Sequence, residues 1–295
     1  MILPSDAVRR VEIRTDDGVT LVAHCLGDPG SMPVVLVPGT FSNHTFWLGT
    51  RGTGFARALA AAGFEAWALD PRGHGDSQKP RRGDDWDFDD WARHDVPAAV
   101  RAAAARSADG RGVVLIGHSA GGATSLIACA VEPEVRRHVR ALVVAATPLP
   151  WLQAMRRIAT FFALGVSRAF GRFPARLVGL GPEDELGGVM VQWMRWQLEG
   201  HWRGDDGTDY AALISTLELP ALFLAGAADR VEAPPAAVHA LFKLAGSRDK
   251  TFLLCGRAGG FSEDFDHAGL LVSRAAREEV WPKIVEWLRR TVREW

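Results

Sequence analysis

The stretch that decides the fold is GVVLIGHSAGG, residues 112–122. Its first half, 113–116, is a short apolar run rich in β-branched residues, which indicates a strand buried on both faces of a parallel sheet. Its second half fits the pattern G-x-S-x-G, and residues 123–131 then favour a helix. Strand, sharp turn and helix together present a serine hydroxyl at a helix N-terminus, where developing negative charge is stabilised. Ser119 is therefore a candidate nucleophile.

The overall composition is that of a folded α/β protein. The chain has 295 residues, 47% of them hydrophobic, and a formal net charge of −1. This balance argues against a nucleic-acid partner, because phosphate binding relies on clustered positive charge. No apolar run reaches the length of about 18 residues that a membrane span needs. The first 19 residues do not resemble a secretory signal. We therefore expect a cytoplasmic protein without a stable membrane anchor.

The cysteines and histidines do not indicate a metal site. Cys25, Cys129 and Cys255 are odd in number, widely spaced and set among apolar residues, which predicts buried free thiols. No Cys/His spacing is typical of zinc binding. We expect neither a metal nor an organic cofactor.

On either side of residues 112–122 the chain alternates strands and helices. Segments 8–15 and 19–26 alternate apolar and polar residues around the turn Asp16-Asp17-Gly18, which predicts an antiparallel hairpin at a sheet edge. Further apolar runs and helical patterns continue the alternation. We expect strands over 33–37, 64–69, 139–145, 219–224 and 251–255, and helices over 55–62, 88–106, 234–245 and 278–292.

This alternation stops between residues 148 and 212. The segment holds many large apolar residues but no convincing strand, and its Gly and Pro residues divide it into short helical pieces. We expect a helical cap over 148–212, packed above a core domain made of 1–147 and 213–295. Its aromatic residues would form either an apolar acyl pocket or the cap's own core, and the sequence leaves both open.

Three side chains placed after predicted strands suit nucleophilic catalysis. Open parallel sheets present functional groups at the carboxyl ends of their strands. Ser119 needs a base to take its proton, and His267, in a loop ahead of the last helix, is our candidate. Asp229 is the candidate acid that would orient His267 and stabilise its imidazolium form. Asp264 and Asp266 lie closer to His267 in sequence and are the competing acids.

Five motifs match a known family. They are LVPGTF (36–41), LDPRGHGDS (69–77), GHSAGG (117–122), LAGAADRV (224–231) and FDHAGLL (265–271). With the order Ser119, Asp229, His267, the chain resembles the α/β-hydrolase fold serine hydrolases from about residue 8 to the C-terminal helix. Residues 41–77 are also similar to the acid-lipase and monoacylglycerol-lipase branch. The resemblance implies a mostly parallel sheet of the eight-stranded type, helices on both faces, a helical cap insertion and a Ser119-Asp229-His267 triad.

The same resemblance implies an oxyanion hole built from main-chain donors. One donor should be the N–H of Ala120, and the other the N–H of Thr40 or Phe41. Pro38 stands where the family commonly has histidine. Because the donors are backbone groups, the hole does not depend on that side chain.

Four further residues are candidates for lining the substrate pocket. They are His44, His118, Trp151 and Trp193. His44 follows the loop of the expected oxyanion hole and suits a structural or surface role equally well. The His118 side chain should point away from the Ser119 hydroxyl. His74, in the turn after the strand 64–69, is expected to be structural.

These features together predict an enzyme that hydrolyses small-molecule carboxylic esters with an apolar acyl or alcohol group. An acyl-enzyme would form on Ser119 and be hydrolysed by water. The same triad also serves enzymes that cleave carbon–carbon, thioester or amide bonds. A ligand-binding protein that keeps the fold without turnover is the third possibility.

Overall fold

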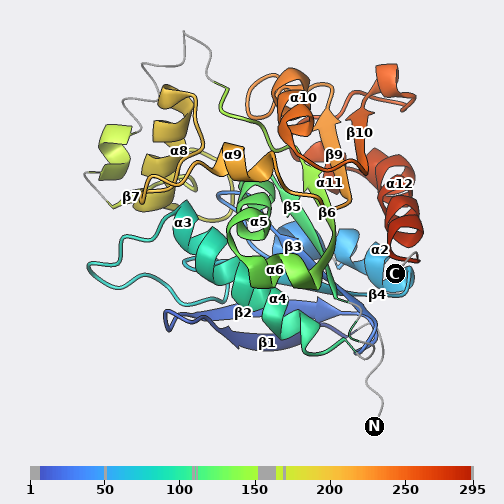
Figure 1. Ribbon diagram of the computed structural model, residues 1–295, viewed down its shortest axis with the longest axis horizontal. Helices are drawn as coiled ribbons and strands as arrows, with labels where there is room; N and C mark the ends of the chain where they lie inside the picture. The colour runs from blue at the N-terminus through green and yellow to red at the C-terminus, as the bar shows by residue number, and fades with distance from the viewer. Residues whose placement is uncertain are drawn as a thin grey trace.

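An eight-stranded sheet forms the centre of the molecule (Figure 1). The computed structural model describes residues 7–49, 52–107, 110, 112–151, 164–168 and 171–293. The sheet has the order β1-β2-β4-β3-β5-β6-β9-β10, and β2 runs antiparallel to both its neighbours while every other pair is parallel. Its strands are β1 Arg9–Arg14, β2 Thr20–Leu26, β3 Met32–Val37, β4 Phe64–Asp70, β5 Val113–His118, β6 Val139–Ala145, β9 Ala221–Gly226 and β10 Lys250–Cys255. The predicted hairpin and the mostly parallel sheet are confirmed.

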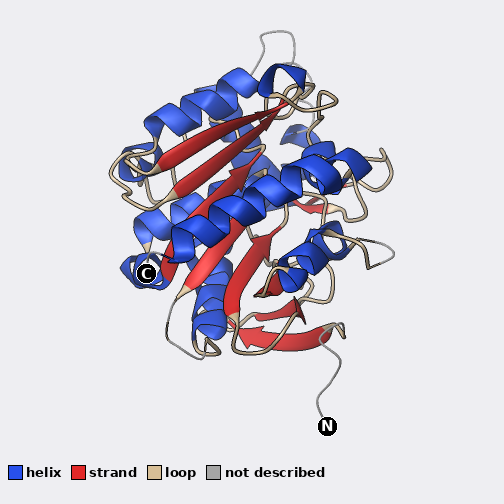
Figure 2. Ribbon diagram, turned by 90° about the vertical axis from the view of Figure 1, so that its right-hand side faces the viewer, coloured by secondary structure: helices blue, strands red, loops and turns tan. Residues whose placement is uncertain are grey.

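Helices cover both faces of this sheet (Figure 2). The α-helices are α1 Thr45–Leu48, α2 Phe55–Ala61, α3 Phe88–Asp90, α4 Val96–Ala104, α5 Ala120–Val131, α6 Pro133–His138, α8 Gly187–Glu199, α9 Tyr210–Ile214, α10 Pro235–Leu244, α11 Gly269–Val272 and α12 Arg274–Arg293. Alternate residues of β3 show the two faces: Val35 and Val37 pack in the cluster with α4 and α5, whereas Val34 and Leu36 pack with α2 and α12. A strand buried on both sides must be apolar throughout, as the sequence indicated.

Two helix boundaries differ from the prediction. The helix expected over 88–106 is one helical stretch in three parts, with a π-helical segment, Trp91–Asp95, between α3 and α4. Pro97 has no N–H to donate, and the N–H of Val96 instead reaches back five residues to the Trp91 carbonyl. The last helix, α12, begins at Arg274, four residues before the expected start, and α11 precedes it.

The segment 148–212 contains strands, contrary to the prediction. Two short strands, β7 Arg172–Phe173 and β8 Glu185–Leu186, pair antiparallel. Pairs of two residues are too short to produce a period-2 pattern in the sequence. The expectation of short helical pieces is also wrong for α8, which runs over 13 residues. In the part of the chain that the structure describes, no helix has both the length and the apolar composition to cross a bilayer.

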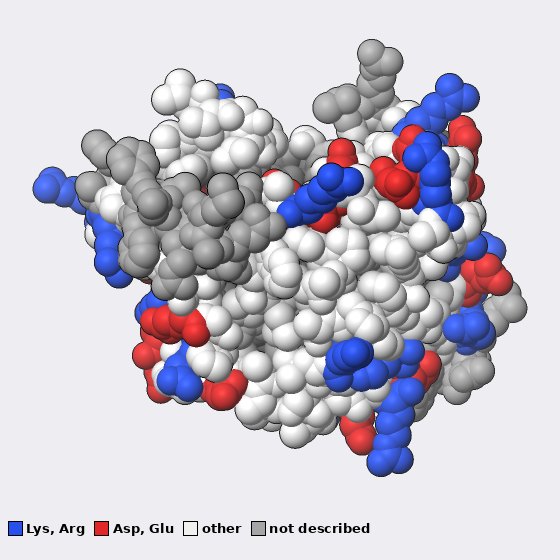
Figure 3. Space-filling view, turned by 90° about the horizontal axis from the view of Figure 1, so that it is seen from above, with Lys and Arg blue, Asp and Glu red and all other residues white. Residues whose placement is uncertain are grey.

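Helix α8 shares a hydrophobic core with one face of the sheet. Trp196, Trp202 and Tyr210 are at most 1% exposed and belong to the cluster that contains the side chains under α4 and α5. Gln192 of α8 accepts a hydrogen bond from the N–H of Phe88 at 2.8 Å. These aromatic residues of the 148–212 segment therefore supply core packing. The surface around this region mixes both charges, and Figure 3 shows Lys and Arg interspersed with Asp and Glu around the rim of the face seen from above.

A buried arginine ties the edge hairpin to the helical stretch 88–104. Arg72 is 0% exposed, and its guanidinium lies 2.8 Å from Asp17 and Asp95 and 3.2 Å from Asp90. Asp95 is also 0% exposed and accepts the backbone N–H of Arg72 at 2.8 Å. Burying charges without partners costs several kcal/mol, so each member of this cluster depends on the others.

We expect Arg72→Leu to lower the free energy of unfolding by about 3–5 kcal/mol, because it leaves buried carboxylates without their cation. Urea unfolding followed by circular dichroism measures the loss. The control is Arg10→Leu, which breaks the exposed Arg10–Glu12 pair and should cost less than about 1 kcal/mol. Equal losses in the two variants would contradict the structural role of Arg72.

Candidate active site

Ser119 lies at a strained turn between β5 and α5. Its backbone has φ 53° and ψ −118°, a conformation that L-residues rarely adopt and that costs about 1–3 kcal/mol. Two hydrogen bonds hold it: the Ser119 N–H donates to the Ala145 carbonyl at 2.8 Å, and the Thr147 hydroxyl donates to the Ser119 carbonyl at 2.9 Å. The turn places Ser119 at the carboxyl end of β5 and at the start of a helix, as the sequence predicted.

The turn requires glycine where three chain segments meet. A Cβ on Gly121 would lie 2.1 Å from the Val37 carbonyl oxygen, and one on Gly117 would lie 2.3 Å from the Gly121 carbonyl oxygen. Contacts this short are not possible, so only glycine lets α5 approach the ends of β3 and β5. The spacing of glycines in G-x-S-x-G follows directly from this packing.

The structure brings Asp229 and His267 together. Nδ1 of His267 lies 2.6 Å from Oδ2 of Asp229, and Asp229 is 2% exposed. The Asp229 carboxylate also accepts backbone N–H groups of Val231, Glu232 and Ala233 at 3.0–3.3 Å. Burial alone would raise the pKa of Asp229, but the His267 hydrogen bond and these N–H groups hold it below the usual range. The carboxylate is therefore ionised and fixes a proton on His267 Nδ1.

The two competing acids face other partners. Asp264 accepts the N–H of Arg257 at 2.8 Å, and Asp266 accepts the N–H of Gly269 at 2.6 Å. Both carboxylates thus stabilise turns in the loops that carry His267.

His118 lies against the loop of His267. Its Nε2 is 2.8 Å from the His267 carbonyl oxygen, and its ring stacks on Phe46 with 4.6 Å between centroids. Burial, with the neighbouring His267, lowers the pKa of His118 to about 3, so the ring is neutral and Nε2 carries the proton. We expected His118 near the pocket with its side chain pointing away from the Ser119 hydroxyl, but not its contact with the His267 carbonyl, which holds the backbone of His267 in place.

Two side-chain atoms of the site, Ser119 Oγ and His267 Nε2, have no hydrogen-bond partner within the described residues. Among the described residues, neither forms a hydrogen bond, with each other or with a third group. Hydrogen bonds of catalytic groups are often long without substrate and tighten when it binds. The Ser119 Oγ is thus available to an incoming group.

Residues 38–41, which we call the oxyanion loop after the role expected from the sequence, lie beside Ser119. A Cβ on Gly39 would be 3.1 Å from the Ser119 Cβ, so the loop and the serine are in contact. Phe41 has φ 64°, and its N–H donates to Glu185 Oε2 at 2.9 Å. Within the described ranges, the N–H groups of Thr40 and Ala120 have no acceptor. Of the two loop donors expected from the sequence, Phe41 is therefore engaged and Thr40 is free.

Glu185 is the residue of this region that the sequence analysis missed. It is 0% exposed, and His74 Nε2, also 0% exposed, lies 3.2 Å from its Oε1. His74 Nδ1 is hydrogen-bonded to the Arg72 carbonyl oxygen at 3.1 Å, whereas Nε2 lies close to Glu185 without the geometry of a hydrogen bond. Although burial opposes it, the Glu185 charge raises the pKa of His74, which favours an imidazolium paired with Glu185. The expected structural role of His74 matches these contacts.

The other three predicted pocket residues, His44, Trp151 and Trp193, contact residues outside the Ser119 and His267 pair. His44 is bound to Asp70 through Nδ1 at 2.9 Å and stacks on His24 with 3.6 Å between centroids. Trp193 packs against Phe88 at 5.9 Å between centroids, and Trp151 is 42% exposed. These contacts involve neither Ser119 nor His267.

Several clusters have the donor types of a cation site. In one, ligand atoms of Asp229, Glu232 and His267 lie within 4.8 Å of one another. Its Asp229 oxygens already accept several N–H groups and the His267 proton, which leaves little capacity for a metal. The three cysteines are free and buried, as predicted.

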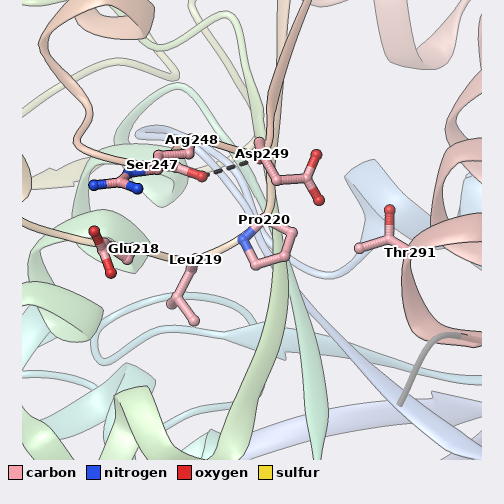
Figure 4. Close-up of a pocket in the computed structure, with 7 residues that line it drawn as sticks. All are labelled: Glu218, Leu219, Pro220, Ser247, Arg248, Asp249 and Thr291. Atoms are coloured by element: carbon pink, nitrogen blue, oxygen red, sulfur yellow. Dashed lines mark hydrogen bonds between the residues drawn. The ribbon is translucent and has the colours of Figure 1, made fainter.

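Two surface pockets lie away from the serine. One, of about 320 Å³, is lined by Pro220, Ser247 and Asp249 among others, at the amino ends of β9 and β10 (Figure 4). The other, of about 490 Å³, lies between α2 and α12 and includes Ala58 and Trp281. Functional groups of open parallel sheets gather at the opposite, carboxyl ends of the strands.

Comparison with known proteins agrees with this architecture. The family model described as alpha/beta hydrolase fold matches residues 32–193, more than half of the chain. No curated protein sequence matches the chain. Among solved structures, DcsB in complex with its substrate analogue has a TM-score of 0.72 at 21% identity, over 98% of this chain and 99% of that chain. A thermophilic esterase from Thermogutta terrifontis has a TM-score of 0.64 at 17% identity, over 96% and 99%. A monoacylglycerol lipase from Paleococcus ferrophilus has 0.59 at 20% identity, over 92% and 99%. At such identities the likeness shows the fold.

The Asp229–His267 contact predicts a pH-dependent contribution to stability. A carboxyl whose pKa is lower in the folded state stabilises the protein above its unfolded pKa, and this is lost as pH falls through the folded pKa. We expect Asp229→Asn to lower the free energy of unfolding by about 1.5–3 kcal/mol near neutral pH. The difference from wild type should shrink below pH 3.8, the ordinary pKa of the carboxyl.

Urea unfolding at neutral and acidic pH measures both effects. Asp264→Asn is the control, because the Asp264 side chain is 44% exposed. A loss in Asp229→Asn that stayed constant with pH would contradict the ionised Asp229–His267 pair.

Proposed function

Since the chain belongs to the α/β-hydrolase fold family, we propose that it is a serine hydrolase of carboxylic esters. The observation that carries the proposal is the combination of a strained serine after β5 and a buried Asp229–His267 pair with 2.6 Å between Oδ2 and Nδ1. A strained turn at a helix start and a histidine held in one tautomer are the two parts that an activated serine needs.

In the proposed reaction, Ser119 Oγ attacks the ester carbonyl carbon as its proton passes to His267 Nε2. The ionised Asp229 stabilises the imidazolium through Nδ1 and keeps its own charge. The carbon–oxygen bond to the alcohol breaks, and His267 returns the proton to the leaving alcohol. Water then attacks the acyl carbon as its proton passes to His267, the bond from that carbon to Ser119 Oγ breaks, and His267 returns the proton to Oγ as the acid leaves.

The oxyanion that forms in each step would be held by two main-chain donors, the N–H groups of Ala120 and Thr40. Both lack acceptors among the described residues, and Gly39 of the same loop touches Ser119. The Phe41 N–H is bound to Glu185, which favours Thr40 over Phe41 as the loop donor. Donors fixed before the reaction stabilise the transition state without reorganisation.

An apolar substrate group suits the surroundings of the oxyanion loop. Leu177, Val178 and Leu180 are 85%, 58% and 53% exposed, and they directly precede Gly181, which packs against Phe41. Clustered exposed apolar side chains mark sites that bind apolar partners. We place them in the predicted cap, 148–212, and propose that they contact the acyl or alcohol chain.

We expect Ser119→Ala to reduce ester turnover by at least about 10³-fold while the fold is retained. Ser262→Ala, which removes an exposed hydroxyl, is the matched control and should keep full activity. Turnover of p-nitrophenyl esters and intact mass after treatment with a fluorophosphonate probe are the measurements. One adduct on wild type and on Ser262→Ala, and none on Ser119→Ala, is the expected result. Full turnover by Ser119→Ala would refute the proposal.

The substrate class is tested with matched ester, thioester and amide substrates of increasing acyl length. We expect esters to give the highest kcat/KM, and the value to rise with chain length up to the size of the pocket. Each buried methylene adds about 0.8 kcal/mol of binding, close to a fourfold change. Faster cleavage of amides or thioesters would assign the same triad to that chemistry instead.

A further inference from the structure

We infer that Glu185 of β8 is a positioning residue, which holds the oxyanion loop in the conformation that presents the Thr40 N–H to the substrate. Gly181, Glu183 and Glu185, which we call the brace, and the oxyanion loop would then act as one unit. The inference rests on the proposed function, because it assigns Thr40 a part in that reaction.

The brace binds both backbone polar groups of Phe41, its N–H and its carbonyl. The Phe41 N–H donates to Glu185 Oε2 at 2.9 Å, and the Phe41 carbonyl accepts the N–H of Glu183 at 3.1 Å. Phe41 has φ 64°, a left-handed conformation that a phenylalanine does not favour unaided. The two hydrogen bonds supply the constraint that keeps it there.

Direct packing strengthens this attachment. A Cβ on Gly181 would lie 2.3 Å from the Phe41 carbonyl oxygen, so the two backbones touch. Glu183 also accepts hydrogen bonds from Asn43 Nδ2 at 2.7 Å and from the Gly75 N–H at 3.0 Å. The brace therefore contacts the oxyanion loop, Asn43 shortly after it and the turn that follows β4 at Gly75.

The Glu185 hydrogen bond acts on Thr40 through a shared peptide. The N–H of Phe41 and the carbonyl of Thr40 belong to one planar group, and the Thr40 N–H lies one pair of torsions before it. Fixing that plane restricts the backbone torsions of Thr40. An oxyanion donor must lie within about 2.7–3.1 Å of the developing charge, so a small rotation is enough to weaken it.

The charge of Glu185 by itself would oppose a nearby oxyanion. His74 Nε2 lies 3.2 Å from Glu185 Oε1, and both residues are fully buried. The raised pKa of His74 favours an imidazolium beside this carboxylate, and such a pair carries no net negative charge. The geometry of Glu185 is thus the property that should matter to the reaction.

Three substitutions separate geometry from charge. Glu185→Gln keeps an oxygen within reach of the Phe41 N–H and removes the charge. Glu185→Asp keeps the charge and shortens the arm by one methylene. Glu185→Ala removes both. Each variant is assayed for kcat, KM and thermal melting, and the fraction of competent sites is counted with the fluorophosphonate probe.

We expect kcat close to wild type for Glu185→Gln, and a loss of at least about tenfold for Glu185→Asp and Glu185→Ala. KM should change little, because an oxyanion donor acts mainly in the transition state. Even if Glu185→Ala does not fold, Glu185→Gln and Glu185→Asp together decide whether the geometry or the charge of Glu185 matters. A wild-type kcat in folded Glu185→Asp would overturn the inference. A lower kcat in Glu185→Gln, while Glu185→Asp keeps the wild-type kcat, would also overturn it.

The neighbouring acid provides the control. Asp184 accepts only the N–H of Arg176, at 3.0 Å, among the described residues, so Asp184→Asn should leave kcat unchanged. A purely structural Glu185 would lower the melting temperature and the competent fraction but not the kcat per competent site. If the wild-type protein shows neither ester turnover nor a probe adduct, the proposed function fails. If the wild-type protein is active and kcat is the same in all Glu185 variants, only the inference about Glu185 fails.

Discussion

The close approach of α5 to the ends of β3 and β5 is the constraint on which the site depends. Gly121 meets the Val37 carbonyl at a distance that admits no side chain, and the chain after Val37 is the oxyanion loop. The same packing that strains Ser119 therefore also sets the loop beside it. Because the strain is local and costs only a few kcal/mol, the large buried sheet can sustain it. The same backbone contacts therefore hold the helix on the sheet and position the residues of the site.

The parts predicted from the sequence are those with local signatures. Alternating apolar residues gave the hairpin of β1 and β2, and short apolar runs gave the parallel strands. The turn at Ser119 was predictable because glycine spacing there is imposed by backbone contact. The pairing of Asp229 with His267 needed the family resemblance as well, since nothing in the order of residues alone says which of three acids faces the ring.

The parts that escaped prediction depend on contacts across long stretches of chain. Glu185 lies 144 residues from Phe41, and His118 lies 149 residues from the His267 carbonyl that it binds. Neither contact produces a periodic pattern in the sequence, because a single polar residue at the end of a strand carries no sign of a distant partner. The β7–β8 pair was missed for a related reason, since two residues cannot show alternation. The π-helical turn follows from Pro97, but a proline near a helix start is also compatible with a regular helix.

The burial of Trp196 and Trp202 limits how far α8 can move away from the sheet. Both rings are at most 1% exposed and belong to the core that covers the sheet. Exposing one such ring to water costs roughly 4–6 kcal/mol. Moving α8 away from the sheet with both rings exposed would therefore cost about as much free energy as unfolding a whole domain. We therefore expect the backbone amide hydrogens of α8 to exchange with solvent as slowly as those of the central strands.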